Sequence, residues 1–329
     1  MRIFAFEYVT AGGWRECAAP ASVIAEGAMM VRALARDLSR LPDVEVVVAR
    51  DPEIALDAIA GDIRAVNPND LWAGWGELMV RSDAVWPIAP ETGGILEEVT
   101  ALALRHGRPV LNSRRDALAI ARSKHATAAH LARAGIAVAA TARPGEPPPA
   151  SEHGWVAKPD DGAGAVDTYL LPDRAALAEW RARRDARDFV VQAFVPGTPL
   201  SLSLLAQDGA AWLLSCNVQH MRCDGGVFAY GGGAVGGAEA RRAALEPLAA
   251  RVAATLPGLW GHVGVDVIDG PGGPVVIEIN PRLTTSYAGL AESVGLNPAG
   301  LVLSLLERPL AALIRPLAPR AVDIVVPRG

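Results

Sequence analysis

The sequence predicts an α/β fold, and three features of the chain support this prediction. Strand-like and helix-like segments alternate through residues 1–112, a pattern typical of a parallel sheet covered by helices. A proline-rich connector at 142–154 indicates a boundary between two parts of the chain. Near the C-terminus, two β-branched segments flank the turn DGPGGP and predict a β-hairpin.

Each element of the first part has its own signal. Residues 22–40 repeat apolar side chains at helical spacing, and the β-branched run VEVVVAR at 44–50 predicts a strand. Residues 51–61 begin with Asp before Pro and end with Gly, as a capped helix does. The other elements expected here are strands at 2–9, 84–90 and 108–112 and a helix at 93–106.

The second part begins with a helical stretch at 113–135 and continues mostly as short apolar strands bounded by Gly, Pro or Asp. The strands expected here are 155–159, 188–195, 200–206, 210–218, 263–268 and 275–280, and the helices are 173–184 and 239–255.

The composition is that of an ordinary globular protein, with 51% hydrophobic and 20% charged residues. The formal net charge of −5 gives no general attraction to nucleic acid, and no apolar run is long enough to span a bilayer. The N-terminal residues lack the pattern of a secretory signal. Cys17, Cys216 and Cys223 suit neither a disulfide framework nor a four-ligand zinc site. We expect a cytoplasmic protein with no nucleic-acid or membrane partner.

Lysine is almost absent from the chain. Of 31 basic residues only Lys124 and Lys158 are lysines, and the rest are arginines. A chain that uses arginine for its surface charge keeps lysine where a compact ammonium group is needed, for example against phosphate. Survival of two lysines by chance is the alternative.

The predicted hairpin carries three oxygen-bearing side chains on one face. Asp266 lies on the first strand, and Glu278 and Asn280 lie at alternate positions of the second. Closure of the turn would bring Asp266 opposite the other two. Carboxylate and amide oxygens suit Mg²⁺ that bridges polyphosphate oxygens. A solvated strand edge with ordinary polar residues is the alternative.

A strand ending in Lys158 runs into the loop DDGAGAVDT, where Gly162 and Gly164 could turn backbone N–H groups onto phosphate. The loop matches neither of the two commonest nucleotide-binding fingerprints. Lys124 stands before an amphipathic helix, where a surface lysine is the alternative. In FVVQAFVPG, an extended segment could present its backbone to an adenine edge while Phe194 packs on the ring, although a plain core strand fits equally well.

The order of these four segments resembles the ATP-grasp superfamily over roughly residues 113–310. The resemblance implies an ATP-grasp fold, with nucleotide between two α+β subdomains at 113–196 and 197–329 and an N-terminal α/β domain at 1–112. By position, the implied ATP contacts are Lys124, Lys158, Gly162, Gly164, Gln192, Phe194 and Val195. The implied ligands of Mg²⁺ (two ions, replaceable by Mn²⁺) are Asp266, Glu278 and Asn280, and Arg282 is the implied catalytic arginine.

The chain departs from the superfamily pattern at two places. Gln192 stands where an acidic residue is common, which leaves the ribose contact unassigned. Gly264 stands where some members carry an arginine, and we expect Arg222 or Arg282 to replace it. FEYVTAGG, APETGGIL and INPRLTTSYAGL are also similar to the tyramine–glutamate ligase group of methanofuran-type cofactor synthesis. This similarity implies substrate contacts from Glu7, Glu91, Thr284, Thr285 and Ser286, for which local capping is the alternative.

The resemblance implies an ATP-dependent ligase that joins a small carboxylate, such as glutamate, to an amine, such as tyramine. An acyl phosphate forms, and ADP and phosphate are released. A homodimer is the expected assembly. The alternatives are another ATP-grasp activity (a different amino-acid or peptide ligase, a carboxylase, a kinase or an acid–thiol ligase), a non-catalytic nucleotide-binding regulator, and an NAD-dependent oxidoreductase. The first loop lacks the three-glycine fingerprint expected of the oxidoreductase.

Overall fold

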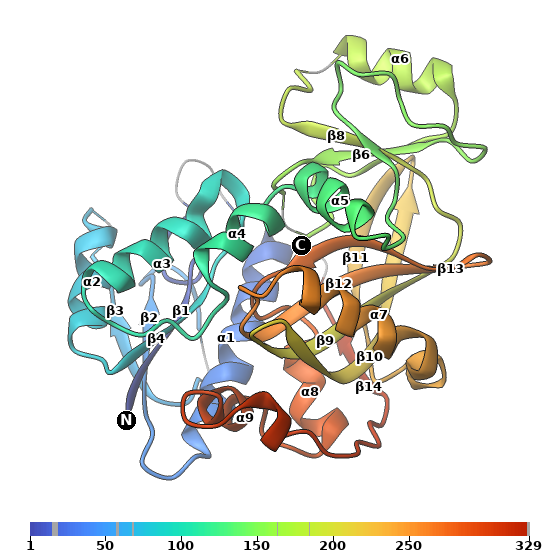
Figure 1. The fold of residues 1–329 in the computed structure, drawn as a ribbon. Coiled ribbons are helices and arrows are strands. Elements are labelled where there is room, and N and C mark those ends of the chain that lie inside the picture. The colour runs from blue at the N-terminus through green and yellow to red at the C-terminus, as the bar shows by residue number, and fades with distance from the viewer. Residues whose placement is uncertain (15–18, 57–58, 68, 163, 184, 328–329) are drawn as a thin grey trace.

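A computed structural model describes residues 1–14, 19–56, 59–67, 69–162, 164–183 and 185–327, and it begins with a parallel sheet (Figure 1). The four strands lie in the order β3-β2-β1-β4, and all their pairings are parallel. Their bounds are Arg2–Glu7 for β1, Glu45–Arg50 for β2, Asp62–Ala65 for β3 and Ala84–Ile88 for β4. The parallel N-terminal sheet is therefore confirmed.

Helices cover both faces of this sheet, so β1 is buried on both sides, as parallel strands are. Ile3 and Ala5 pack towards α1 (Ala21–Ser39), whereas Phe4 and Phe6 pack towards α2 (Leu71–Val80) and α3 (Ile95–Arg105). The ring of Phe6 meets that of Trp75 edge-on, with centroids 4.8 Å apart.

Two predicted elements of the first part are wrong. Among the described residues of 51–61 there is no helix, because Asp51 closes a single turn: its carboxylate accepts the N–H of Glu53 at 3.0 Å, and its carbonyl accepts that of Ile54. Gly61, at φ +105°, then leads directly into β3. The strand expected at 108–112 is reduced to one bridge between Val85 and Val110.

The remaining strands form one antiparallel sheet. Their order is β13-β12-β9-β10-β11-β7-β6-β8-β5, with β14 paired to β11. Figure 1 shows β6, β8 and α6 standing above the body of this sheet. The strands are β5 (Thr141–Ala142), β6 (Trp155–Pro159), β7 (Tyr169–Leu171), β8 (Phe189–Ala193), β9 (Thr198–Gln207), β10 (Ala210–Asp224), β11 (Val227–Val235), β12 (Gly261–Gly270), β13 (Gly273–Asn280) and β14 (Val322–Val325).

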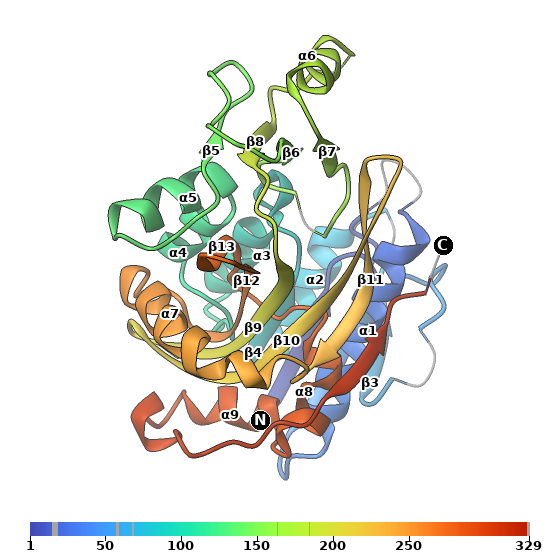
Figure 2. The same ribbon diagram turned by 90° about the vertical axis from the view of Figure 1, so that its right-hand side faces the viewer.

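Helices lie on both faces of the lower part of this sheet (Figure 2). Leu202 and Leu204 of β9 pack towards α7 (Arg242–Thr255). Leu205 belongs instead to the core shared with α1, α8 (Tyr287–Val294) and α9 (Pro298–Ser304). That shared core joins the N-terminal sheet to the antiparallel sheet. The remaining helices are α4 (Arg115–Ala121), α5 (Lys124–Arg133) and α6 (Arg174–Arg183), with 3₁₀ turns η1 (Thr92–Gly94), η2 (Glu239–Arg241) and η3 (Leu310–Ala312).

The structure therefore has a parallel α/β part and a mixed α+β part, as predicted. The helical stretch at 113–135 is two helices, α4 and α5, and the C-terminal hairpin is β12 and β13. Within the described residues, no helix has both the length and the apolar character needed to span a membrane. The boundaries 1–112, 113–196 and 197–329 stay predictions.

Candidate active site

The hairpin of β12 and β13 brings the three predicted oxygen-bearing side chains together. Asp266 pairs with Glu278, and Gly264 pairs with Asn280. The register shifts after Asp266, so that Val267 pairs with Val276 and Ile277 is the extra residue of a bulge. A bulge re-aims the side chains that follow it. It lets Val276 enter the core while Glu278 and Asn280 line the cavity beside Asp266.

The two carboxylates lie next to each other, and their pKa values shift in opposite directions. Asp266 accepts hydrogen bonds from Nε2 of Gln219 at 3.0 Å and from Nδ2 of Asn280 at 3.2 Å. Its enclosure and the adjacent charge of Glu278 raise its pKa well above the usual range. Enclosure alone would also raise the pKa of Glu278, but the ammonium groups of Lys124 and Lys158 outweigh it and lower this pKa to about 2.

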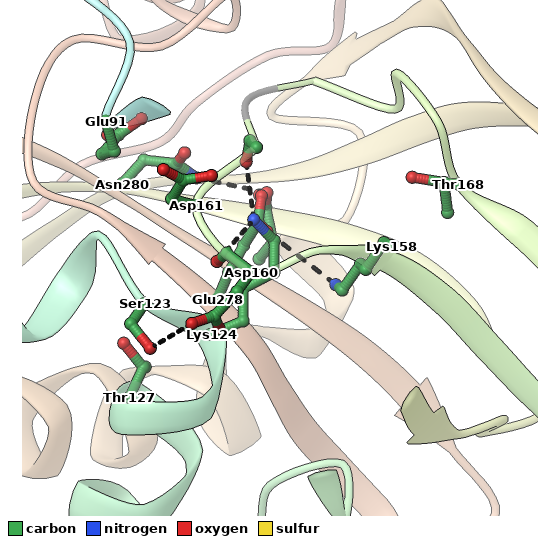
Figure 3. Close-up of polar contacts among 12 residues, drawn as sticks. Glu91, Ser123, Lys124, Thr127, Lys158, Asp160, Asp161, Thr168, Glu278 and Asn280 are labelled. Carbon is green, nitrogen blue, oxygen red and sulfur yellow. Dashed lines mark hydrogen bonds and ion pairs between the residues drawn. The ribbon is translucent and has the colours of Figure 1, made fainter. Parts of the chain in front are cut away.

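Both lysines of the chain point at Glu278 (Figure 3). Nζ of Lys124 lies 3.3 Å from Oε2 of Glu278, and Nζ of Lys158 lies 3.8 Å from the same oxygen. The two lysines are buried, and burial, helped by the nearby charge of Lys124, lowers the pKa of Lys158 to about 8. Two ammonium groups that share one carboxylate are poised to take an additional anion such as a polyphosphate.

A residue that the sequence analysis missed, Asp160, holds the two lysine-bearing segments together. Its carboxylate accepts the hydroxyl of Ser123 at 2.7 Å and the N–H of His125 at 2.8 Å. Its carbonyl accepts the N–H of Lys124 at 3.0 Å. Ser123 also caps α5 by accepting the N–H of Ala126. The start of α5 is thus fixed to the end of β6, two residues after Lys158.

The glycine loop after Lys158 contacts both Lys124 and the N-terminal part of the chain. Nζ of Lys124 donates to the carbonyl of Gly162 at 2.6 Å. Asp161 accepts the N–H of Gly93 at 2.8 Å and, through its carbonyl, the hydroxyl of Thr92 at 2.9 Å. Gly164 lines the cavity with a left-handed backbone (φ +67°), which favours glycine. Residue 163 of this glycine loop lies outside the described residues.

The segment predicted to contact adenine, residues 192–195 and here called the hinge, lies along the same cavity. Gln192, Phe194 and Val195 all line it, and Nε2 of Gln192 donates to the hydroxyl of Thr141 at 3.0 Å. The N–H of Phe194 donates to the carbonyl of Gly154, so it is already used within the fold. Of the predicted hinge, this leaves the ring of Phe194 and the backbone of Val195 as the expected adenine contacts.

Arg282 joins the hairpin to the N-terminal part of the chain. Its Nη2 donates to Oε2 of Glu91 at 2.9 Å, and its Nη1 donates to the carbonyl of Leu283. Nε of Arg282 and Oε1 of Glu91 are buried without a hydrogen-bond partner among the described residues. Arg282 lines the cavity, as does Arg222 from β10. Both arginines considered as replacements at the Gly264 position of the superfamily pattern therefore line this cavity.

Gly264 itself is required by close packing. A Cβ atom there would lie 2.6 Å from Cγ2 of Thr284 and 3.4 Å from Cβ of Asn280. Because Thr284 occupies this space, no larger side chain fits beside Asn280 without a shift. The departure from the superfamily pattern therefore has a local steric cause.

The cavity has a volume of about 1010 Å³ and continues from the hinge past the hairpin to α1 and β1. Four of the predicted substrate contacts line this end of the cavity: Glu7, Thr284, Thr285 and Ser286. The fifth, Glu91, accepts a hydrogen bond from Arg282, which also lines the cavity. Several of these side chains already form hydrogen bonds within the protein. Glu7 accepts the N–H groups of Val9 and Thr10, and the hydroxyls of Thr284, Ser286 and Ser203 form a chain.

The donor set fits Mg²⁺. Two adjacent carboxylates in an enclosed site repel each other, and a divalent cation bound to both would relieve this repulsion. The described residues contain no cluster of three or more His, Cys, Asp and Glu side chains suited to a metal. The amide of Asn280 would therefore have to supply the third oxygen. Two carboxylates and an amide leave room for phosphate oxygens and water, as Mg²⁺ sites on nucleotides require.

Two family sequence models match the chain. One, described as an ATP-grasp domain, matches residues 121–286, and the other, described as a pre ATP-grasp 3 domain, matches residues 44–118. The first match contains both lysines, the hinge, the hairpin residues and Arg282.

Two curated relatives carry the name tyramine–L-glutamate ligase. The protein from Methanocaldococcus fervens is 25% identical over 299 residues, which are 88% of this chain and 89% of that protein. The protein from Methanocaldococcus jannaschii is 37% identical over 103 residues, and this match spans only 31% of the chain and 32% of the relative. The solved structure of an ATP-grasp superfamily protein from Archaeoglobus fulgidus is similar with a TM-score of 0.70 at 25% identity, over 92% of this chain and 88% of that one.

Proposed function

The chain belongs to the ATP-grasp family and is an ATP-dependent ligase that forms C–N bonds, and we propose that it joins a carboxylic acid to an amine through an acyl phosphate. The observation that carries this proposal is the convergence of Lys124 and Lys158 on Glu278, directly opposite Asp266. This arrangement suits a polyphosphate chain whose last phosphoryl group ends near Arg282.

In the proposed reaction, a carboxylate oxygen of the acid attacks the γ-phosphorus of ATP, and the bond from this phosphorus to the β,γ-bridging oxygen breaks. ADP leaves and an acyl phosphate remains. Lys124 and Lys158 orient the phosphates, and Arg282 stabilises the transferred group through its buried Nε, which has no partner among the described residues. Mg²⁺ held by Asp266, Glu278 and Asn280 would neutralise phosphate charge. Two such ions, and replacement by Mn²⁺, are part of the proposal.

Exclusion of water is the next requirement, because an acyl phosphate hydrolyses when water reaches it. In this proposal the loop after Lys158 covers the phosphates, and its Asp161 accepts hydrogen bonds from Thr92 and Gly93 of the N-terminal part. We infer that this contact keeps the loop closed during the acyl phosphate stage.

We propose glutamate as the acid and tyramine, or a similar amine, as the second substrate. The names of two relatives support this choice, and so does a cavity that carries Arg282 at one point and apolar walls beyond it. A role in cofactor biosynthesis, a cytoplasmic location and a homodimer belong to the same proposal.

The experiment that tests the proposal incubates the protein with ATP, Mg²⁺, glutamate and a panel of amines, with products identified by mass spectrometry. We expect an amide together with equal amounts of ADP and phosphate, formed only when acid and amine are both present. AMP and pyrophosphate, or phosphorylated product without amide, would contradict it.

A further inference from the structure

We propose that Glu26 is the residue that receives the amine substrate: its carboxylate binds the incoming ammonium group and takes a proton as the nitrogen attacks the acyl phosphate. The inference rests on the proposed function and assigns a residue to its second half-reaction. Glu26 was not among the residues singled out from the sequence.

Glu26 is placed where it can meet a substrate in the cavity. Glu26 lies on α1, lines the cavity and is partly exposed to it. Its Oε2 accepts the hydroxyl of Thr285 at 2.9 Å, three residues after Arg282 in the loop that follows β13. This bond across 259 positions of sequence fixes Glu26 beside the loop that holds Arg282. Arg282 is close enough for its charge to act on Glu26, against the burial that raises the pKa of this glutamate.

The second support is that the other glutamates at this end are already used. Glu7 accepts one backbone N–H on each of its carboxylate oxygens, from Val9 at 3.1 Å and from Thr10 at 2.7 Å, and so shapes a turn. Glu91 is paired with Arg282. Among the described residues, the hydrogen-bond partner of Glu26 is the neutral hydroxyl of Thr285, so the negative charge of Glu26 can meet a cation from the substrate.

The third support is the chemistry of the walls. Around Glu26 the cavity is lined by Val23 and Met30 of α1, Tyr230 of β11, and Val326. Such walls suit a primary amine with an apolar or aromatic body. A carboxylate on the carbon next to the nitrogen would lie against Glu26, so an amine without this carboxylate is the expected substrate class.

An alkyl amine arrives as R–NH₃⁺ at neutral pH, as a lysine side chain does. Glu26 accepts one proton, the nitrogen lone pair forms the C–N bond at the acyl carbon, and the bond from this carbon to the phosphate oxygen breaks. The second proton leaves the nitrogen with the departing phosphate as HPO₄²⁻. The product is the neutral amide, and Glu26 releases its proton to solvent.

The test compares wild type with Glu26→Gln, which keeps an oxygen for Thr285 but removes the charge, and with the exposed control Glu98→Gln on α3. Hydroxylamine, a small neutral nucleophile, traps the acyl phosphate as a hydroxamate without needing an ammonium site. With glutamate and ATP we expect hydroxamate formation in all three proteins at similar rates. With tyramine, we expect Glu26→Gln to lose at least ~100-fold in kcat/KM, with the KM of ATP unchanged.

A second readout uses tyrosine, which is tyramine with a carboxylate beside the nitrogen. Wild type should have a much higher kcat/KM for tyramine than for tyrosine. Glu26→Gln should reduce the ratio of these two kcat/KM values at least tenfold. Equal tyramine kinetics in wild type and Glu26→Gln, or an unchanged preference, would overturn the assignment of Glu26. If wild type makes neither amide nor hydroxamate, the proposed function itself fails, and this assignment fails with it.

Discussion

Nη2 of Arg282 lies 2.9 Å from Oε2 of Glu91, and this ion pair joins two residues 191 positions apart. Both side chains are more than nine-tenths buried. Glu91 comes from the loop before η1 in the N-terminal part, whereas Arg282 follows the hairpin that carries Asp266 and Glu278. The N-terminal part therefore holds the arginine that we propose acts on the transferred phosphate.

Glu91→Gln should lower both stability and turnover. The substitution removes the ion-pair partner of the buried guanidinium of Arg282, and breaking a buried pair typically costs about 3 kcal/mol. A less firmly held Arg282 should reduce kcat at least tenfold. Thermal unfolding and steady-state kinetics measure the two effects, with the exposed Glu98→Gln as the matched control. A Glu91→Gln protein with unchanged melting temperature and kcat would show that the pair is incidental.

Asp266→Asn should abolish product formation and yet stabilise the protein in the absence of Mg²⁺. The neutral amide removes both the cost of burying a charged carboxylate and its repulsion from Glu278, which together raise the pKa of Asp266. Wild type should gain melting temperature when Mg²⁺ is added, and the variant should gain little, because ligand binding stabilises only a protein that retains the site. Asp323→Asn, at an exposed position of β14, is the control. An equal Mg²⁺ response in wild type and Asp266→Asn would remove Asp266 from the metal site.

Asp161→Asn should uncouple ATP consumption from amide formation. The substitution weakens the hydrogen bond from the N–H of Gly93, so the loop should open more often and admit water to the acyl phosphate. We expect the ratio of phosphate to amide to rise from near one to several. The exposed Asp173, which accepts the N–H of Ala176 at the start of α6, provides Asp173→Asn as the control. A ratio that stays at one in Asp161→Asn would mean that this contact does not seal the site.

The stability of the protein should fall as the pH drops from about 7 to 4, partly because of His262. This residue packs edge-on against Tyr287, and burial lowers its pKa from 6.5 to about 4. The unfolded chain therefore binds a proton in this range that the folded protein excludes, which costs as much as about 3 kcal/mol at the acid end. His262→Phe should flatten this part of the stability–pH curve. Urea unfolding at several pH values measures it, and parallel curves for the two proteins would contradict the prediction.

Local signals in the sequence were enough to predict much of the fold. The alternation of strand and helix predicted the parallel sheet, and the turn DGPGGP predicted the hairpin whose register sets Asp266 against Glu278. The helix predicted at 51–61 was wrong because Asp before Pro is typical of both a helix cap and a tight turn. Here the N–H of Asp51 is held by the carbonyl of Thr10, a distant contact that no local pattern reveals.

The candidate site was predictable only where residue type and spacing carried information. The scarcity of lysine pointed to Lys124 and Lys158, and both do converge on Glu278. Glu26 and Asp160 were missed because their roles depend on partners far away in sequence. The bond from Thr285 to Glu26 spans 259 positions, and no motif links the two segments.

In the proposed reaction, a carboxylate is activated as an acyl phosphate before the amine attacks. The most direct measurement supplies glutamate labelled with ¹⁸O in its carboxylates, together with ATP and the amine, and follows the label by mass spectrometry. We expect each amide formed to be accompanied by one phosphate that carries a single ¹⁸O atom from the acid. Amide formed with wholly unlabelled phosphate would contradict it.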